Sequence, residues 1–382
     1  MTSQEMLTAH PGHLETRPPS ETQVRSNPIG SDYEVVDRRY LTAATSEVLP
    51  WQDGSDITYV ESGRQALAVA EIELRRQGHT DLHVPSYLCD SMISPFARND
   101  TLGRDGWSLR ALPVDSDLVV RPADLLSLVT KGVLLHAPYF GRQDSAATLD
   151  ALQTLRRRGV VVIVDETHRV LSGPSKVADI RVASLRKLLP LYDGGYVTGV
   201  PALLHTGESE VAALRRMAMH SKSGALATRG SREYCLALFA KAEHATQTRT
   251  QPAPMSEGSL ALLRHLDLDL VRSTRQTNAT LLATLVGRSG FFRILNQPAQ
   301  DLQPSHLVLE TDDPTGLRQF LAGHEIYCPI HWPPSELLPG TQRWPTRYIS
   351  LPIDHRYGAQ DMQRTATTVQ TFFPQKWRGS AS

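Results

Sequence analysis

Lys187 is the first residue in this sequence whose chemistry stands out. The chain has 34 arginines but only six lysines, at positions 131, 176, 187, 222, 241 and 376. An arginine keeps its proton near neutral pH, whereas a lysine amine can lose its proton and form a Schiff base with an aldehyde. Lys187 ends the segment Ala183-Ser184-Leu185-Arg186-Lys187, which follows an apolar run. We therefore predict that Lys187 is a catalytic lysine.

A carboxylate precedes this lysine at the end of another apolar segment. Residues 160–164 read Val-Val-Val-Ile-Val and predict a buried strand that ends at Asp165. Asp165 can bond a pyridinium nitrogen, and Ser184, three residues before Lys187, can bond a phosphate. This layout is typical of a pyridoxal 5'-phosphate (PLP) site. Taken singly, Asp165 and Ser184 could each simply end a strand.

Five further residues could complete the cofactor site, and these also have structural explanations. Ser62-Gly63-Arg64 precedes an expected helix, where backbone N–H groups bind anions, although Ser62 could be an ordinary N-cap. His168 could stack on the cofactor ring or bond its phenolic oxygen, or it could be a loop histidine. Tyr87 follows a short strand and could stack on the ring or belong to the core.

Arg347 is the candidate for binding the substrate. It precedes an apolar strand in Thr346-Arg347-Tyr348-Ile349-Ser350. A planar guanidinium can bind a carboxylate through two parallel hydrogen bonds. We therefore predict that Arg347 binds a substrate carboxylate, although it could also be a surface arginine.

The elements that must position these residues alternate between strands and helices from about residue 57 to 200. This pattern predicts a mostly parallel sheet covered by helices, with ligands at the carboxyl ends of the strands. Residues 208–288 are expected to be largely helical, and a smaller α+β region follows. We expect a mobile N-terminal arm over residues 1–30, a large α/β domain over 31–250 and a small domain over 251–382 that begins with a long helix.

Composition excludes several other classes of function. Lysine plus arginine equals aspartate plus glutamate at 40 each, so nothing favours binding to nucleic acid or to an anionic membrane. The three cysteines, at 89, 235 and 328, have no paired metal-ligand spacing and predict reduced thiols in a cytoplasmic protein. No apolar run approaches the ~20 residues of a membrane span.

The motifs together resemble those of the fold-type-I PLP enzymes, and among them the DegT/DnrJ-like aminotransferases. The matching pieces, from about Tyr59 to Phe373, are Ser62-Gly63-Arg64, Pro85-Ser86-Tyr87, Tyr139-Phe140-Gly141, Asp165-Glu166-Thr167-His168, Ser184-Leu185-Arg186-Lys187, Asp193-Gly194-Gly195 and Ser350-Leu351-Pro352. The resemblance implies Lys187 as the Schiff-base lysine, Asp165 at the pyridine nitrogen and His168 near the ring. It also implies a phosphate site at residues 62–64 and Ser184, and a homodimer with active sites at its interface.

The expected function is a PLP-dependent aminotransferase of an amino acid or a 2-oxo acid, in a biosynthetic pathway. The short Ser-Leu-Arg-Lys segment and Arg347 both argue against a nucleotide sugar. The alternatives are transamination of an amino sugar, or elimination, replacement, decarboxylation or cyclisation of an amino acid on the same cofactor. A PLP-binding regulator without catalysis is the remaining alternative, and the retained Lys187 argues against it.

Overall fold

The computed structural model describes residues 28–43, 49–97, 106–201, 209–224, 229–249, 251–288, 292–299, 303–338 and 346–379. Seven strands form the main sheet, in the order β2–β8–β7–β6–β5–β3–β4. Their bounds are β2 (Ile57–Val60), β3 (Asp81–Pro85), β4 (Ser108–Leu112), β5 (Val133–His136), β6 (Val161–Asp165), β7 (Ile180–Ser184) and β8 (Gly195–Thr198). Strand β8 runs in the opposite direction to the other six strands, which are parallel to one another. The carboxyl ends of β2, β6 and β7 therefore meet at one edge of the sheet.

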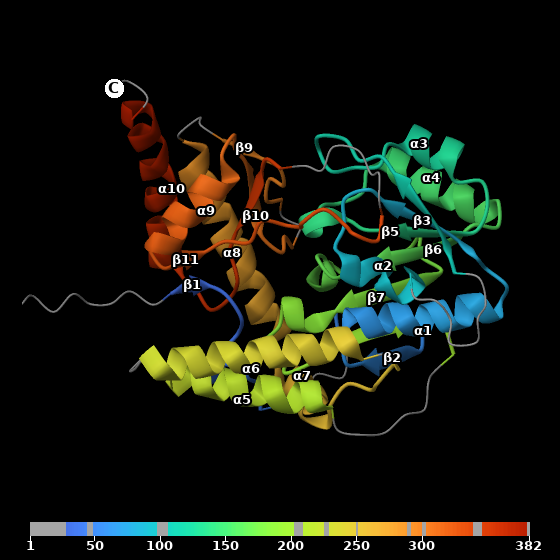
Figure 1. The fold of residues 1–382 in the computed structure, drawn as a ribbon, viewed down its shortest axis with the longest axis horizontal. Helices are drawn as coiled ribbons and strands as arrows, with labels where there is room; N and C mark the ends of the chain where they lie inside the picture. Colours follow the sequence, from blue (N-terminus) through green and yellow to red (C-terminus); the bar gives the residue numbers. More distant parts are fainter. Residues whose placement is uncertain are drawn as a thin grey trace, which may run out of the picture.

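Helices cover both faces of this sheet (Figure 1). On one face, α1 (Gly63–Arg76) and α2 (Asp90–Ala97) pack against side chains that include Val133, Leu135 and Ile163. On the other face, α3 (Pro122–Leu128) and α4 (Ala146–Arg157) pack against Leu134, Val162 and Val164. Successive residues of a strand point to opposite faces, so β5 and β6 are buried on both sides. This explains why their sequences are continuous apolar runs rather than alternating ones.

A helical region connects the main sheet to a smaller one. The helices α5 (Glu210–Gly224) and α6 (Arg229–Thr248) lie side by side, and α7 (Glu257–His265) and α8 (Leu268–Gly287) follow (Figure 1). The small antiparallel sheet has the order β12–β10–β9, with β9 at Arg293–Ile294, β10 at Leu307–Glu310 and β12 at Tyr348–Leu351. Its apolar core also includes residues of α8, α9 (Pro314–Gly323) and α10 (Ala359–Gly379).

Short elements complete the described chain. The strand β1 (Ile29–Gly30) pairs in parallel with β11 (Ile326–Tyr327). Single turns of 3-10 helix are η1 (Arg38–Tyr40), η2 (Tyr139–Gly141), η3 (Val170–Ser172) and η4 (Leu185–Lys187).

The predicted fold class is confirmed, with local differences. The strand β5 ends at His136, shortly before Pro138, which cannot donate to a strand ladder, and Phe140, which has a φ of 56°. Residues 1–27 of the predicted mobile arm lie outside the described residues, whereas Ile29 and Gly30 form β1. The proposed domain limits at 30 and 250 stay predictions. No helix in the described part of the chain has the length and apolar character needed to cross a membrane.

Candidate active site

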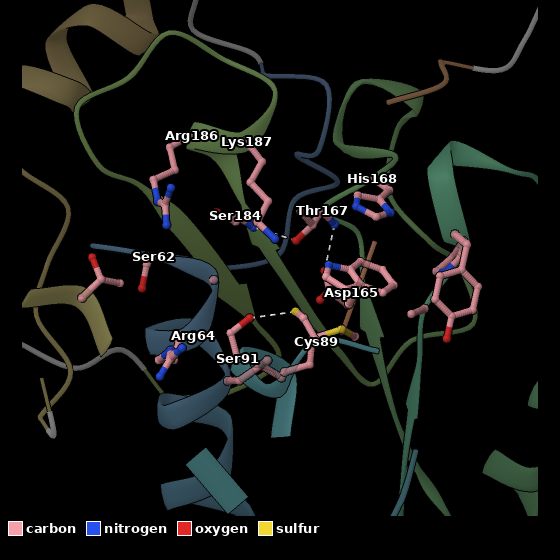
Figure 2. A pocket seen from close by; sticks show the side chains of 18 of the residues that line it. Ser62, Arg64, Cys89, Ser91, Asp165, Thr167, His168, Ser184, Arg186 and Lys187 are labelled. Atoms are coloured by element: carbon pink, nitrogen blue, oxygen red, sulfur yellow. Dashed lines mark hydrogen bonds between the residues drawn. The ribbon is translucent and has the colours of Figure 1, made fainter. Parts of the chain in front are cut away.

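A narrow cavity of about 110 Å³ lies at the carboxyl end of the main sheet (Figure 2). It brings together residues from segments more than 120 positions apart in the sequence. Seven of the nine predicted site residues line it: Ser62, Gly63, Arg64, Asp165, His168, Ser184 and Lys187. The sheet causes this convergence, because β2, β6 and β7 deliver their following residues to the same edge.

The N-terminus of α1 forms part of the cavity wall. Ser62 is the N-cap of α1, and its Oγ accepts a hydrogen bond from the Gln65 backbone N–H at 3.4 Å. Gly63 lies so close to β7 that a Cβ there would stand 2.9 Å from the Ser184 Cβ. A Cβ on Gly195 would similarly meet the Ser62 carbonyl carbon at 2.6 Å. The two glycines therefore let the first turn of α1 approach Ser184, where the helix N-terminus favours a phosphate.

Two adjacent carboxylates at the end of β6 have different surroundings. Asp165 lines the cavity, and its Oδ1 accepts a hydrogen bond from the Thr167 N–H at 2.9 Å. Glu166 is almost fully buried and accepts hydrogen bonds from the Tyr196 hydroxyl and the Ser175 N–H, each at 2.5 Å. Burial raises the pKa of both carboxyl groups. Strand alternation thus leaves Asp165 facing the cavity and gives Glu166 a structural role.

Lys187 lies on η4, immediately after β7 and Ser184. Its side chain is exposed and lines this cavity and a neighbouring one. The preceding Arg186 donates to Glu243 of α6 at 3.0 Å. The charge of Lys187 offsets part of the rise that burial causes in the pKa of Asp165, and the net shift is upward. An amine and a carboxylate therefore face the same narrow space.

His168 is held in a defined orientation at the junction of the two cavities. Its Nδ1 accepts a hydrogen bond from the Phe140 backbone N–H at 3.1 Å. Its ring is stacked on Phe140 at 5.2 Å and on Trp332 at 5.8 Å between centroids. Burial, with the charge of Lys187, holds its pKa well below the usual value. The neutral ring therefore carries its proton on Nε2, which can donate to a ligand.

The second cavity adjoins the first and is wider, at about 490 Å³. It shares His168, Arg186 and Lys187 with the first cavity. Its remaining walls come largely from three segments, around residues 30–33, 327–331 and 352–356, with single side chains from α5 and α8 and two from α9. A cofactor in the first cavity would thus have open space for a second molecule beyond Lys187.

The structure corrects the prediction for Tyr87. This side chain is fully buried in an apolar cluster behind the cavity, and it contacts Tyr139 and Trp332 with ring centroids 5.6 and 5.1 Å apart. Cys89 lines the cavity instead, with its Sγ 2.8 Å from the Ser91 Oγ. Since β3 ends at Pro85, the turn that follows sends Tyr87 inward and brings Cys89 to the cavity.

The structure also places Arg347 outside both cavities. Its side chain is 57% exposed, and its guanidinium pairs with Asp312 and Glu310. Arg347 stands at the start of β12, whereas Pro352 to Asp354, beyond the far end of this strand, line the second cavity. Four strand residues span roughly 10 Å, so this Arg is at the wrong end of the element. The structure therefore does not bring Arg347 to the space beside Lys187, and its role in binding the substrate stays a prediction.

Several cavity residues were not predicted from the sequence. Arg186 is next to Lys187 and could have been found from that position, but Glu243, Thr246 and Trp332 lie far away in the chain. Nothing in their local sequence indicates a site. No group of three or more His, Cys, Asp or Glu suited to holding a metal occurs in the parts of the chain that the structure describes.

No family model and no curated protein matches this sequence. Several solved structures do match its fold. A DegT DnrJ EryC1 StrS aminotransferase from Brucella abortus is 17% identical with a TM-score of 0.55, and 84% of this chain and 86% of that chain are covered. DesV from S. venezuelae, in complex with a ketimine intermediate, is 19% identical with a TM-score of 0.57 and coverages of 83% and 85%. The putative sugar aminotransferase Spr1654 from Streptococcus pneumoniae, in its PMP form, is 14% identical with a TM-score of 0.60 and coverages of 85% and 88%.

These likenesses extend over most of the chain. At identities of 14% to 19% they show shared architecture, and they do not transfer an activity. The strand order, the helices on both faces and the smaller antiparallel sheet fit the same conclusion. This chain therefore has the fold of the DegT/DnrJ-type, fold-type-I aminotransferase structures.

Proposed function

We propose that this protein is a PLP-dependent aminotransferase. The observation that carries the proposal is the first cavity, where Lys187 and Asp165 face one space that ends at an anion site on α1. The residues present fit the cofactor: Ser62, Gly63 and Ser184 suit its phosphate, and the half-buried Asp165 suits its pyridine nitrogen. When bound, PLP supplies an electron sink for the carbon that gains or loses the amino group.

The side chains of this site have separable roles in such a reaction. The Lys187 amine would hold the cofactor and then add or remove a proton at the substrate carbon. Asp165 would keep a proton on the ring nitrogen, for which a carboxylate is needed. His168 would donate from Nε2, because its Nδ1 already accepts the Phe140 N–H. Closure of the cavity by Trp332 and His168 would limit the access of water.

The direct test uses reduction of the cofactor adduct. Purified protein is saturated with PLP, treated with borohydride and mapped by peptide mass spectrometry. We expect a pyridoxyl label on Lys187 and on no other lysine of the chain. Lys187→Arg is the matched control, since it keeps the charge and should remove the label. Labelling at a different lysine in the native protein would contradict the proposal.

The substrate is an amino acid or a 2-oxo acid, with glutamate or another amino acid as the donor. The second cavity supports an acidic substrate through charges other than Arg347. An amino sugar is the second candidate, favoured by solved structures of this fold that are named sugar aminotransferases. A screen of 2-oxo acids and keto sugars, with detection of the aminated product, separates the two. Ammonia or carbon dioxide release without an acceptor would instead favour elimination or decarboxylation.

We further propose a cytoplasmic homodimer that serves a biosynthetic pathway. Three side chains on the α5–α6 pair support an additional subunit contact, since Met217, Tyr234 and Leu236 are 50%, 54% and 55% exposed. The free thiols of Cys89, Cys235 and Cys328 suit a reducing compartment. Analytical ultracentrifugation tests the assembly, and an active monomer would contradict it.

A further inference from the structure

The second cavity carries more positive than negative side chains. Six cationic residues line it: Arg186, Lys187, Arg215, Arg275, Arg318 and Arg356. Only two carboxylates line it, Asp32 and Asp354. The cavity thus has a surplus of positive charge beside the amine of Lys187.

Three of these cations already have carboxylate partners. Arg356 pairs with Asp354 at 2.8 Å, and Arg215 pairs with Asp32 at 2.8 Å. Arg186 pairs with Glu243, which lines the first cavity. These contacts use both of the acidic residues in the wall of the second cavity. The remaining cations are Lys187, Arg275 and Arg318, of which Lys187 and Arg318 are exposed to water.

Arg275 and Arg318 are the arginines that remain. Neither has a carboxylate within ion-pair distance in the part of the chain that the structure describes. Arg318 is exposed, so water can solvate its charge. Arg275 is only 1% exposed, and neither its Nε nor its Nη1 has a hydrogen-bond partner in the described structure. Its Nη2 donates to the Ser305 carbonyl at 2.6 Å.

An unpaired guanidinium in the interior is unfavourable, since buried charges are normally paired and hydrogen-bonded. The charge of Arg275 helps to lower the pKa of Asp354, but in the described structure that carboxylate accepts side-chain hydrogen bonds from Arg356, at 2.8 and 3.0 Å, and not from Arg275. The Ser305 carbonyl accepts from only one of the three guanidinium nitrogens. An oxyanion in the cavity would satisfy the others through charge-assisted hydrogen bonds.

Two histidine rings line the same cavity as this arginine and Lys187. His306 and His331 line the cavity, and their ring centroids are 5.2 Å apart. Each has its Nδ1 near a serine hydroxyl, at 3.2 Å from Ser305 and 2.9 Å from Ser350. Burial and the Arg275 charge lower the pKa of His306 to about 3. These rings offer hydrogen bonds without a second fixed charge, so Arg275 and Arg318 decide where an anionic group would bind.

We propose that Arg275 binds an oxyanion group of the substrate in the second cavity, with Arg318 attracting that group at the exposed side. This inference rests on the proposed function, because it identifies the cavity beside Lys187 as the substrate site. The chemical class is a substrate with a carboxylate or a phosphate remote from the reacting carbon. The carboxylate belongs to an amino acid or 2-oxo acid, and the phosphate to a nucleotide sugar.

The test measures binding rather than turnover. Isothermal titration of the PLP-loaded protein uses 2-oxoglutarate, with its dimethyl ester as the uncharged probe, and uridine diphosphate, with uridine as the uncharged probe. We expect at least one charged probe to bind at least tenfold more tightly than its uncharged counterpart. Arg275→Gln should reduce that affinity at least tenfold, and Arg318→Gln by a smaller factor. Arg347→Gln is the matched control and should leave it unchanged.

The pair of probes that shows the preference identifies the carboxylate or the phosphate as the group recognised. Unchanged affinity in Arg275→Gln, or no preference for either charged probe in the native protein, would overturn the inference. If circular dichroism shows that Arg275→Gln is unfolded, Arg275→Lys takes its place and should lose affinity at least threefold. Borohydride labelling of Lys187 is recorded on the same samples. If the native protein carries the label on Lys187 but binds charged and uncharged probes equally, only this inference is contradicted. If the native protein carries no label on Lys187, the proposed function is contradicted.

Discussion

The two cavities that meet at Lys187 are built in different ways. The first lies where β2, β6 and β7 end, so its residues follow strands of one sheet. The second is bounded largely by the segments around residues 30–33, 327–331 and 352–356, with a few side chains from α5, α8 and α9. Strand ends are fixed by the backbone ladder, whereas helix faces and connections depend on how separate elements pack. The residues of the first cavity can therefore be predicted from local sequence patterns, whereas those of the second cannot.

The largest expected effect comes from removing the amine shared by both cavities. Lys187→Arg keeps a positive charge but cannot lose its proton near neutral pH, so we expect activity to fall by about 10³-fold or more. The measurement is single-turnover kinetics with a substrate found in the screen, alongside the cofactor absorbance. Lys176→Arg is the control, because Lys176 lines neither cavity. Retained turnover in Lys187→Arg would mean that another group does this chemistry.

Asp165→Asn tests whether the carboxylate at the end of β6 contacts the cofactor. Asn cannot keep a proton on the cofactor nitrogen, so we expect kcat to fall by roughly 10²-fold while the protein stays folded and binds PLP more weakly. Glu166→Gln is the matched variant one residue later. It should lower stability by about 1–3 kcal/mol through a weakened buried hydrogen-bond pair, with kcat nearly unchanged. If both variants behaved alike, the assignment of the two faces of β6 would fail.

Gly63→Ala probes the close contact at the anion end of the first cavity. The added Cβ would lie 2.9 Å from the Ser184 Cβ, so α1 and β7 must move apart. We expect PLP affinity to fall by about tenfold, equivalent to ~1.4 kcal/mol. Fluorescence titration with PLP measures this change. Gly258→Ala is the control, because a Cβ at Gly258 would meet no atom closer than 3.8 Å. Equal PLP affinity in Gly63→Ala and the native protein would show that the close approach of α1 to β7 is not needed to bind PLP.

The stability of the protein should depend on pH through His306, which lines the second cavity. His306 is neutral in the folded protein, where desolvation and the charge of Arg275 lower its pKa to about 3, whereas an unfolded histidine titrates near 6.5. The unfolded state therefore binds the extra proton first, and stability falls as the pH drops below 6.5. This loss is up to ~1.4 kcal/mol per pH unit until about pH 3. The buried carboxyl groups of Asp165 and Glu166 have the opposite sign, because their raised pKa values lower stability as the pH rises.

Urea unfolding at pH 7.5 and pH 5 measures the contribution of His306. The native protein should lose more stability between these two values than His306→Gln does, by roughly 1–2 kcal/mol. His79→Gln is the control, because His79 lines neither cavity. An identical pH dependence in the native protein and His306→Gln would show that this ring is not buried in its neutral form.

Arg347→Gln is expected to have the smallest effect. Its partners Asp312 and Glu310 form an exposed ion-pair cluster, so stability should change by less than about 1 kcal/mol. Steady-state kinetics should stay within about twofold of the native values. A tenfold rise in KM would mean that Arg347 reaches the substrate after all, in a conformation or an assembly different from this one.

The sequence alone was enough for the sheet and most of the first cavity. Apolar runs such as Val160–Val164 identify buried strands, and the parallel sheet then requires Asp165, Ser184 and the residues after Val60 to meet at one edge. Lys187 could be identified because lysine is rare in this chain and follows Ser184 by three residues. These are local signals whose spatial consequence is set by the backbone.

Only the tertiary structure decided which face or end of an element meets the cavity. Tyr87 and Cys89 are two residues apart in one turn, and packing against Tyr139 and Trp332 sends the tyrosine inward. Arg347 precedes a correctly predicted strand but stands at the end that points away from Lys187. Arg275 looks like any other arginine of a helix until α8 packs and leaves its guanidinium buried without a carboxylate. A sequence pattern encodes local periodicity, whereas these outcomes depend on long-range packing between elements.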